Sequence, residues 1–95
     1  MLIRFYIDDE TDRPHVENHG ITTRECVEVL ERPGQDFATQ SGARAAYGQT
    51  RAGMYLKVIY RLIEEHDEVF VITAYRLKGK DLAAFKRRMK RRGKR

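Results

Sequence analysis

The chain has little of what stabilises or targets many small proteins. Its 95 residues include one cysteine, two prolines and no tryptophan. Cys26 cannot close an internal disulfide and no paired-cysteine motif suggests zinc, so one domain over residues 1–95 must depend on an ordinary hydrophobic core in a reducing compartment. The opening "MLIRFYIDDE" lacks a long apolar run. This predicts neither a signal peptide nor a membrane span, and indicates a cytoplasmic protein without membrane attachment.

Positive charge is confined to one end of the chain. The net charge is +5, yet residues 1–75 carry 8 basic and 13 acidic side chains, whereas residues 76–95 carry 11 basic side chains and one acidic. Clustered Lys and Arg are typical of a contact with nucleic acid or with an acidic protein, because they displace counterions from a phosphate backbone. The alternative is a solvated tail that only keeps the protein soluble.

The first third of the chain predicts one strand and two helices. "LIRFYI" is rich in β-branched and aromatic residues and indicates a strand. "PHVENHG" predicts a short helix from Pro14 to Gly20, with His15 and His19 one turn apart on the same face. "TTRE" fits a capping box with Thr22 as the N-cap, and the apolar stripe that follows predicts a helix that ends at "RPG".

The remainder predicts a strand meander and a basic helix. "QDFATQS", "ARAAYGQT", "MYLKVIYRLIEE" and "EVFVITAYRL" indicate four strands. Asp81 is the expected N-cap of a last helix whose apolar side carries Leu82, Phe85 and Met89. The predicted fold is α+β, in the order β-α-α-β-β-β-β-α, with an antiparallel sheet of four to five strands. Residues 86–95 form a basic C-terminal extension for which disorder is the alternative.

Alternation along the two long strands predicts which sheet face is buried. The expected core positions are Leu56, Val58, Tyr60 and Leu62 on the first strand, and Phe70, Ile72 and Ala74 on the second. Because a slip of one residue would reverse the faces of a strand, the register that joins these two sets places a second group on the opposite face. That group consists of Lys57, Arg61, Thr73 and Tyr75. With helices on the core side, the other face of the sheet is expected to be open and polar.

Several chemistries find no support in the sequence. "HVENH" spaces two histidines at i and i+4, but the zinc-protease motif needs Glu directly after the first His, where this chain has Val16. Cys26 lies in the apolar stripe of a helix, as a small core residue does. "SGARAAYGQTRAG" matches neither the phosphate-loop nor the dinucleotide spacing. We therefore expect no metal and no cofactor.

Metal-independent cleavage of RNA fits the residue types that remain. The 2′-hydroxyl is an internal nucleophile, so the protein need only supply a base, an acid and cations that stabilise the phosphate. His15 or His19 can exchange the proton, and Tyr75 can donate or orient one. The candidate catalytic residues are His15, His19, Arg44, Lys57, Tyr75 and Arg76. The candidate RNA-binding residues, which stack on bases or pair with phosphates, are Tyr47, Tyr55, Arg61, Lys86, Arg87, Arg88, Lys90 and Arg91.

Four segments together resemble a known family. "HVENHGITTRECVEVLERP", "GARAAYGQT", "YLKVIY" and "VFVITAY" are similar to the BrnT-like ribonuclease toxins and related small domains of the RelE-like superfamily. The resemblance implies that the α+β fold is RelE-like. It also implies a bacterial toxin that cuts RNA and is silenced by a cognate antitoxin protein. It also implies a site that contains His15, His19, Arg44 and the strand end at Tyr75 and Arg76. The basic residue of that strand end is displaced by one position here, which would turn Arg76 to the other face of the sheet.

Two other functions stay open at this point. A non-catalytic member would bind RNA or a partner protein through the same basic surface. A DNA-binding regulator is a further alternative, although no helix-turn-helix recognition helix is apparent. The sequence leaves the oligomeric state open.

Overall fold

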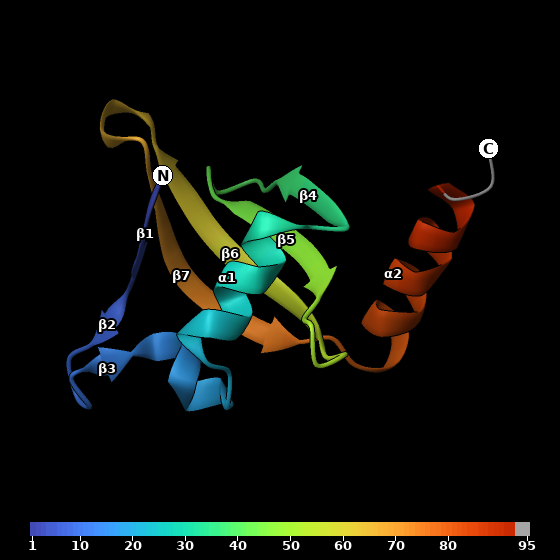
Figure 1. Cartoon of the computed structure of the whole chain (residues 1–95), viewed down its shortest axis with the longest axis horizontal. Helices are drawn as coiled ribbons and strands as arrows, with labels where there is room; N and C mark the ends of the chain where they lie inside the picture. The colour runs from blue at the N-terminus through green and yellow to red at the C-terminus, as the bar shows by residue number, and fades with distance from the viewer. Residues whose placement is uncertain (93–95) are drawn as a thin grey trace.

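The computed structural model describes residues 1–92, which form an α+β arrangement around a mixed five-stranded sheet (Figure 1). Along the sheet the strand order is β1-β7-β6-β5-β4. The strands are β1 (Leu2–Phe5), β2 (Ile7–Asp8), β3 (Arg13–Pro14), β4 (Gln35–Ala38), β5 (Arg44–Gln49), β6 (Tyr55–Ile63) and β7 (Glu68–Arg76). The helices are α1 (Thr23–Glu31) and α2 (Gly79–Arg92), with short 3₁₀ helices η1 (His15–His19) and η2 (Glu64–His66).

Strands β4 to β7 form the antiparallel meander that the sequence predicts, but β1 runs parallel to its neighbour β7. The expectation of an antiparallel sheet is therefore wrong for its first strand. The predicted element order also missed β2 and β3, which pair as a small separate hairpin. Two residues in each strand are too few for the alternation by which a strand is recognised in a sequence.

The helices begin and end close to the predicted positions. Thr22 accepts a hydrogen bond from the backbone N–H of Glu25, whose side chain accepts one from the backbone N–H of Thr22, so the capping box of α1 is complete. The predicted first helix is a single 3₁₀ segment, η1. Helix α2 begins at Gly79, so Asp81 lies in its first turn and is not the N-cap. Of the predicted basic extension, residues 86–92 are helical and residues 93–95 lie outside the described part of the chain.

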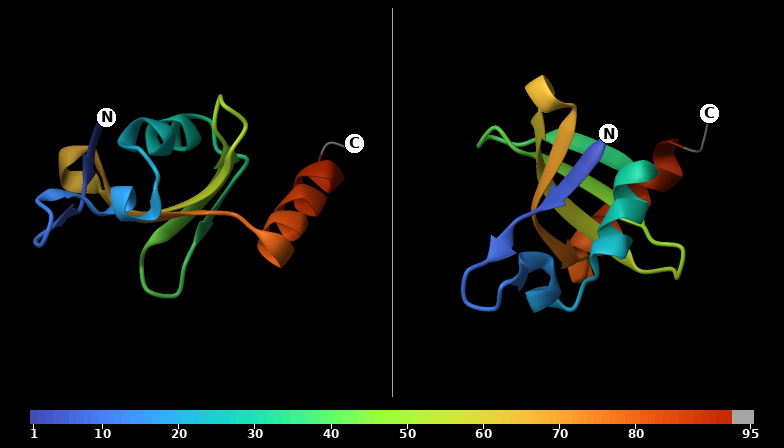
Figure 2. Two further views of the ribbon diagram at one scale, coloured as in Figure 1. Left: turned by 90° about the horizontal axis from the view of Figure 1, so that it is seen from below. Right: turned by 60° about the vertical axis from the view of Figure 1, so that its left-hand side comes forward.

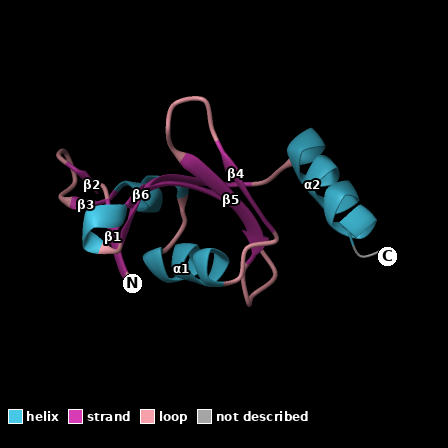
Figure 3. Cartoon of the chain, turned by 90° about the horizontal axis from the view of Figure 1, so that it is seen from above, coloured by secondary structure: helices cyan, strands magenta, loops and turns pink. Residues whose placement is uncertain are grey.

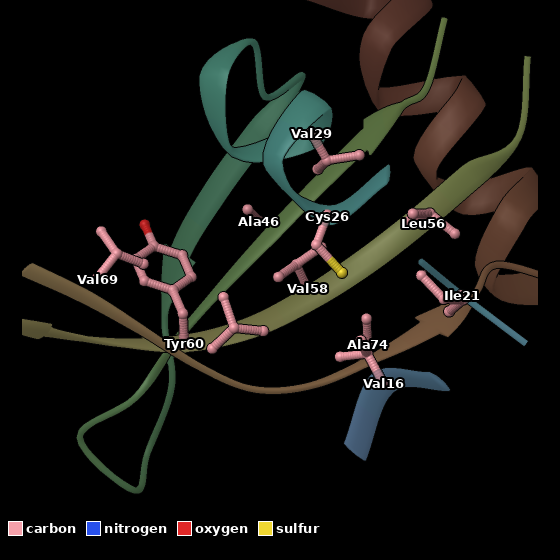
Figure 4. Close-up of a cluster of buried hydrophobic side chains, with 11 residues drawn as sticks. Val16, Ile21, Cys26, Val29, Ala46, Leu56, Val58, Tyr60, Val69 and Ala74 are labelled. Carbon is pink, nitrogen blue, oxygen red and sulfur yellow. The ribbon is translucent and has the colours of Figure 1, made fainter. Parts of the chain in front are cut away.

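Helix α1 covers one face of the sheet, and no helix formed by residues 1–92 covers the middle of the other (Figure 2, left; Figure 3). Cys26 and Val29 of α1 pack on Ala46, Val58 and other buried residues of the central strands (Figure 4). The loop of residues 39–43 projects on the side away from α1 (Figure 2, left). The sheet therefore has a core face under α1 and an open face behind it.

A bulge in the β6–β7 pair changes which residues of β7 are buried. Ile59 is opposite Thr73 but Tyr60 is opposite Val71, so Ile72 is an extra residue on β7. An extra residue reverses the alternation beyond it. Val69 and Val71 are accordingly in the core, and the prediction that Phe70 and Ile72 would be buried there is wrong. Leu62, another predicted core residue, is 47% exposed because α1 does not reach that end of β6.

The thiol of Cys26 is expected to be inert in the folded protein. The residue is fully buried, and this burial raises its pKa from an ordinary value of 9.0 to about 12. Iodoacetamide at pH 8 should leave native Cys26 unmodified and should alkylate it after unfolding in urea. Because the folded state holds this proton more tightly, the group contributes stability that is present below about pH 9 and is lost progressively up to about pH 12. The free energy of unfolding should therefore fall less steeply with pH in Cys26→Ala than in the wild type.

Helix α2 stands beyond the end of the sheet (Figure 1), and Phe85 is its one buried residue among those described. Phe85 is 3% exposed, and its ring lies 6.0 Å from the ring of Tyr47 and 6.0 Å from that of Tyr55. A Cβ atom added to Gly34 would lie 2.9 Å from the tip of the Phe85 ring, so glycine at this position is what lets the helix approach β4. The docking of α2 fixes where its cations lie relative to the open face.

Candidate functional site

The candidate site is a row of side chains that crosses four strands of the open face. Gln35 of β4 is opposite Tyr47 of β5, Tyr47 is opposite Lys57 of β6, and Lys57 is opposite Tyr75 of β7. Tyr47, Lys57 and Tyr75 each follow or precede a core residue and therefore point away from α1, and Gln35 shares their face because it is opposite Tyr47. His19 of η1 extends the row, since its ring lies 5.0 Å from that of Tyr75. We call these five residues the open-face row.

The histidine end of the row is held by a hydrogen-bonded group at the β2–β3 hairpin. The ring of His15 packs edge-on against that of His19, at 5.3 Å between centroids. His15 Nδ1 lies 3.3 Å from Asp8 Oδ2, and Asn18 Nδ2 donates to the same oxygen at 2.6 Å. Hydrogen bonds from the Glu10 backbone and from the Asn18 and His15 side chains hold the pKa of Asp8 below its usual value. His15 is thus oriented by a carboxylate, while His19 and Tyr75 remain exposed.

Lys57 supplies the positive charge in the middle of the row. Its Nζ lies 5.6 Å from the centre of the Tyr47 ring, and it forms no ion pair with any of residues 1–92. A lysine that no carboxylate neutralises keeps its full attraction for an anion. With Tyr75 beside it, the row combines an imidazole, a phenol and an ammonium group on one uncovered surface.

The structure changes the interpretation of Tyr47 and Tyr55. We predicted that both rings stack on unpaired bases, but Phe85 stacks on Tyr47 at an interplanar angle of 17° and meets Tyr55 nearly edge-on. Lys86 Nζ also lies 5.0 Å from the centre of the Tyr55 ring. Both tyrosines therefore serve first as the docking surface for α2, and their ring faces are not free for a base.

Arg44 and Arg76 lie on the other face of the sheet, so their predicted place beside His19 and Tyr75 is wrong. Arg44 Nε donates to Asp36 Oδ1 at 3.0 Å, and the Tyr60 hydroxyl donates to the other oxygen of the same carboxylate. These contacts are on the core side, because Tyr60 belongs to the core under α1. Bonds within this group raise the pKa of Arg44, and burial is the first cause of the raised pKa of Tyr60. Arg76 is opposite Leu56 and alternates with Tyr75, as the displaced strand end predicts.

Arg44→Ala is therefore expected to act on stability and not on the open face. The change removes an ion pair with Asp36 whose partners are about one third exposed, so a loss of about 1 kcal/mol in the free energy of unfolding is expected. Urea denaturation measures this loss. RNA binding and cleavage by the folded variant should match those of the wild type. A large loss of either would show that Arg44 takes part in the functional site.

The other predicted cations fall into two groups. Arg61 lies on the open face, four residues along β6 from Lys57, which separates the two residues by about 13 Å. Its guanidinium donates a hydrogen bond to the Ser41 carbonyl at 3.3 Å. The cations of α2 surround the end of the row at Gln35: Arg88 Nε donates to Gln35 Oε1 at 2.6 Å, and Arg92 donates to the carbonyl of Gly34. Lys86, Arg87, Lys90 and Arg91 are exposed and form no ion pair in the described part of the chain.

Sequence reasoning missed Gln35, Phe37 and Asp8. Gln35 and Phe37 alternate in "QDFA", so the period of a strand could have placed them on one face, but β4 is too short for the pattern to stand out. Asp8 comes near His15 only through the two-residue hairpin of β2 and β3, for which the sequence gives no signal.

Comparisons with known proteins identify no relative of the chain: no family model, curated protein or solved structure matches it. Over residues 1–92, no helix has both the length and the apolar character of a membrane span. Within the same residues, no three His, Cys, Asp or Glu side chains gather in a way that could hold a metal ion.

Proposed function

We propose that the protein is an endoribonuclease of the RelE-like toxin class that cleaves RNA on the open face without a metal. The observation that carries the proposal is the convergence of His19, Tyr75 and Lys57 on a surface that no helix of the described residues covers. These are the three kinds of group that the reaction requires, and Tyr75 is 44% exposed, so a substrate can reach them.

The reaction transfers two protons and exchanges two P–O bonds. A base removes the proton of the ribose 2′-hydroxyl, and the oxygen attacks the adjacent phosphorus. The bond from phosphorus to the 5′-oxygen then breaks, an acid protonates that oxygen, and the products are a 2′,3′-cyclic phosphate and a 5′-hydroxyl end. The nucleophile belongs to the substrate itself, so no metal is needed to generate it.

The open-face row supplies these roles from neighbouring positions. His19 is the group that exchanges a proton with the substrate, and the Tyr75 hydroxyl donates a hydrogen bond or a proton beside it. Lys57 stabilises the negative charge that grows on the phosphate oxygens in the transition state. His15, held by Asp8, packs against His19 and fixes the orientation of its ring.

The charge distribution supports an RNA substrate. The unpaired cations of α2 lie at one end of the molecule, beside the Gln35 end of the row, so one RNA strand can contact both. The same basic helix is a suitable contact for an acidic antitoxin protein. We propose such an antitoxin as the cellular partner, as the resemblance to toxins implies.

A second candidate is a domain that binds RNA without cleaving it. It is favoured by the position of Arg44, which is paired with Asp36 on the other face of the sheet. The open-face row therefore lacks an arginine that could form two hydrogen bonds to a phosphate. The RNA would then be held by Lys57 and the α2 cations alone.

A cleavage assay separates these functions. Purified protein is incubated with 5′-labelled single-stranded RNA in EDTA, and products are tested for 2′,3′-cyclic phosphate ends. The enzyme should cleave RNA but not the same sequence as DNA or 2′-O-methyl RNA, which lack the nucleophile. Binding to all three without cleavage would favour the non-catalytic function. Induced expression in bacteria should arrest growth if the protein is a toxin.

A further inference from the structure

We propose that Phe37, with Gln35 and Arg88, forms a nucleobase-binding subsite that selects single-stranded RNA and prefers guanine to adenine. This inference rests on the proposed RNA substrate and specifies how that substrate is recognised. The subsite lies on β4, the strand at the edge of the sheet (Figure 1).

Phe37 is the one aromatic ring near α2 that the helix leaves accessible within the described residues. Phe37 follows Gln35 by two positions along β4, so both side chains lie on the open face. Phe37 is 43% exposed. The ring packs edge-on against Tyr47 at 5.8 Å, while the Arg88 guanidinium lies 5.7 Å from its centre. An exposed ring fixed by such neighbours is a platform on which a base can stack.

The polar groups beside the ring are mainly hydrogen-bond donors. Arg88 Nε donates to Gln35 Oε1 at 2.6 Å, which uses one of the two lone pairs of that oxygen, while the amide NH₂ group of Gln35 remains a donor. The terminal nitrogens of Arg88 are also donors. Guanine presents two acceptors, O6 and N7, on one edge, and arginine binds them as a pair. Adenine presents an acceptor beside an amino donor, and the amide oxygen that would accept from that donor already accepts from Arg88, so it is the weaker match.

The subsite binds a different nucleotide from the one that is cleaved. Gln35 and Tyr75 are separated by three strand spacings, which is about 14 Å. A base on Phe37 therefore belongs to a nucleotide further along the strand. Because that base must leave its stack to reach the ring, the subsite selects unpaired RNA over a duplex.

Binding of an oligonucleotide that cannot be cleaved tests the subsite independently of catalysis. The probe is a fluorescent 2′-O-methyl hexanucleotide with one guanine among uracils, and fluorescence anisotropy gives its Kd. Phe37→Ala should raise the Kd about tenfold to a hundredfold, the range of losses found for a stacked base. Leu62→Ala is the matched control, since Leu62 is similarly exposed but lies at the far end of the core face. It should bind as the wild type does.

The base preference is tested by replacing guanine with adenine in the same probe. The wild type should bind the guanine probe about tenfold more tightly, and Arg88→Lys, which keeps the charge, should lose this preference. Equal binding of the hexanucleotide by Phe37→Ala and the wild type would overturn the subsite, even if the wild type cleaves RNA. Binding that depends on Phe37 without any cleavage would support the subsite and contradict only the proposed enzyme. A wild type that binds no hexanucleotide would overturn both.

Discussion

His19→Ala is expected to lower the rate of RNA cleavage by about 10²–10⁴-fold, the usual contribution of a general acid or base. The variant should keep its fold, because the side chain is exposed and its ring contacts are with other surface rings. Tyr75→Phe keeps the ring that packs on His19 but removes the hydroxyl, so it should also slow cleavage. The rate is measured in single-turnover reactions with excess protein, so that product release does not limit it.

His66→Ala is the matched control for this experiment. His66 is exposed on η2, at the end of the hairpin between β6 and β7, and should be replaced without a change in rate. The Kd for 2′-O-methyl RNA should change little in His19→Ala, because the effect belongs to the chemical step. A His19→Ala protein that cleaves as fast as the wild type would remove the open-face row from the mechanism.

Neutralising three cations of α2 is expected to weaken RNA binding about a hundredfold at about 0.1 M salt. Arg87, Lys90 and Arg91 are exposed and make no ion pair in residues 1–92, so their replacement by glutamine leaves the docking of Phe85 intact. Each phosphate contact of a single strand contributes about 0.7 to the slope of log K against log salt, so the slope should fall by about 2. Titrations at several salt concentrations measure it.

The control for this variant changes the same amount of charge elsewhere. Arg13, Arg24 and Arg51 are exposed, and the first two pair with glutamates in their own segments. Glutamine at all three positions should leave the slope nearly unchanged. If both triple variants lose affinity equally, the protein attracts RNA through its net charge, and α2 is not the surface that binds.

The fold could be predicted wherever a local pattern determines it. The capping box at Thr22, the alternation along β6 and the positions of β4, β5 and β7 follow from propensity and period. The parallel pairing of β1 with β7 could not be predicted, because it joins segments from opposite ends of the chain. The bulge at Ile72 was missed for a different reason: an inserted residue leaves the composition of the strand unchanged while it reverses the faces beyond it.

The candidate site was predicted in part for the same reasons. Lys57 and Tyr75 lie on one face because their register follows from the core residues between them. His19 joins them through the path of η1 along β7, which no sequence period specifies. Arg44 was misplaced because it was assigned to the site from its residue type and from the family resemblance, neither of which specifies a sheet face, whereas its position on β5 turns it toward Asp36.

The position of β1 at the edge of the sheet bears on when the protein becomes functional during synthesis. Strand β1 pairs with β7, which is made more than sixty residues later, so the sheet stays incomplete until β7 has been synthesised. Tyr75 stands next to the last residue of β7. A chain that stops before β7 therefore has neither a complete five-stranded sheet nor an assembled open-face row.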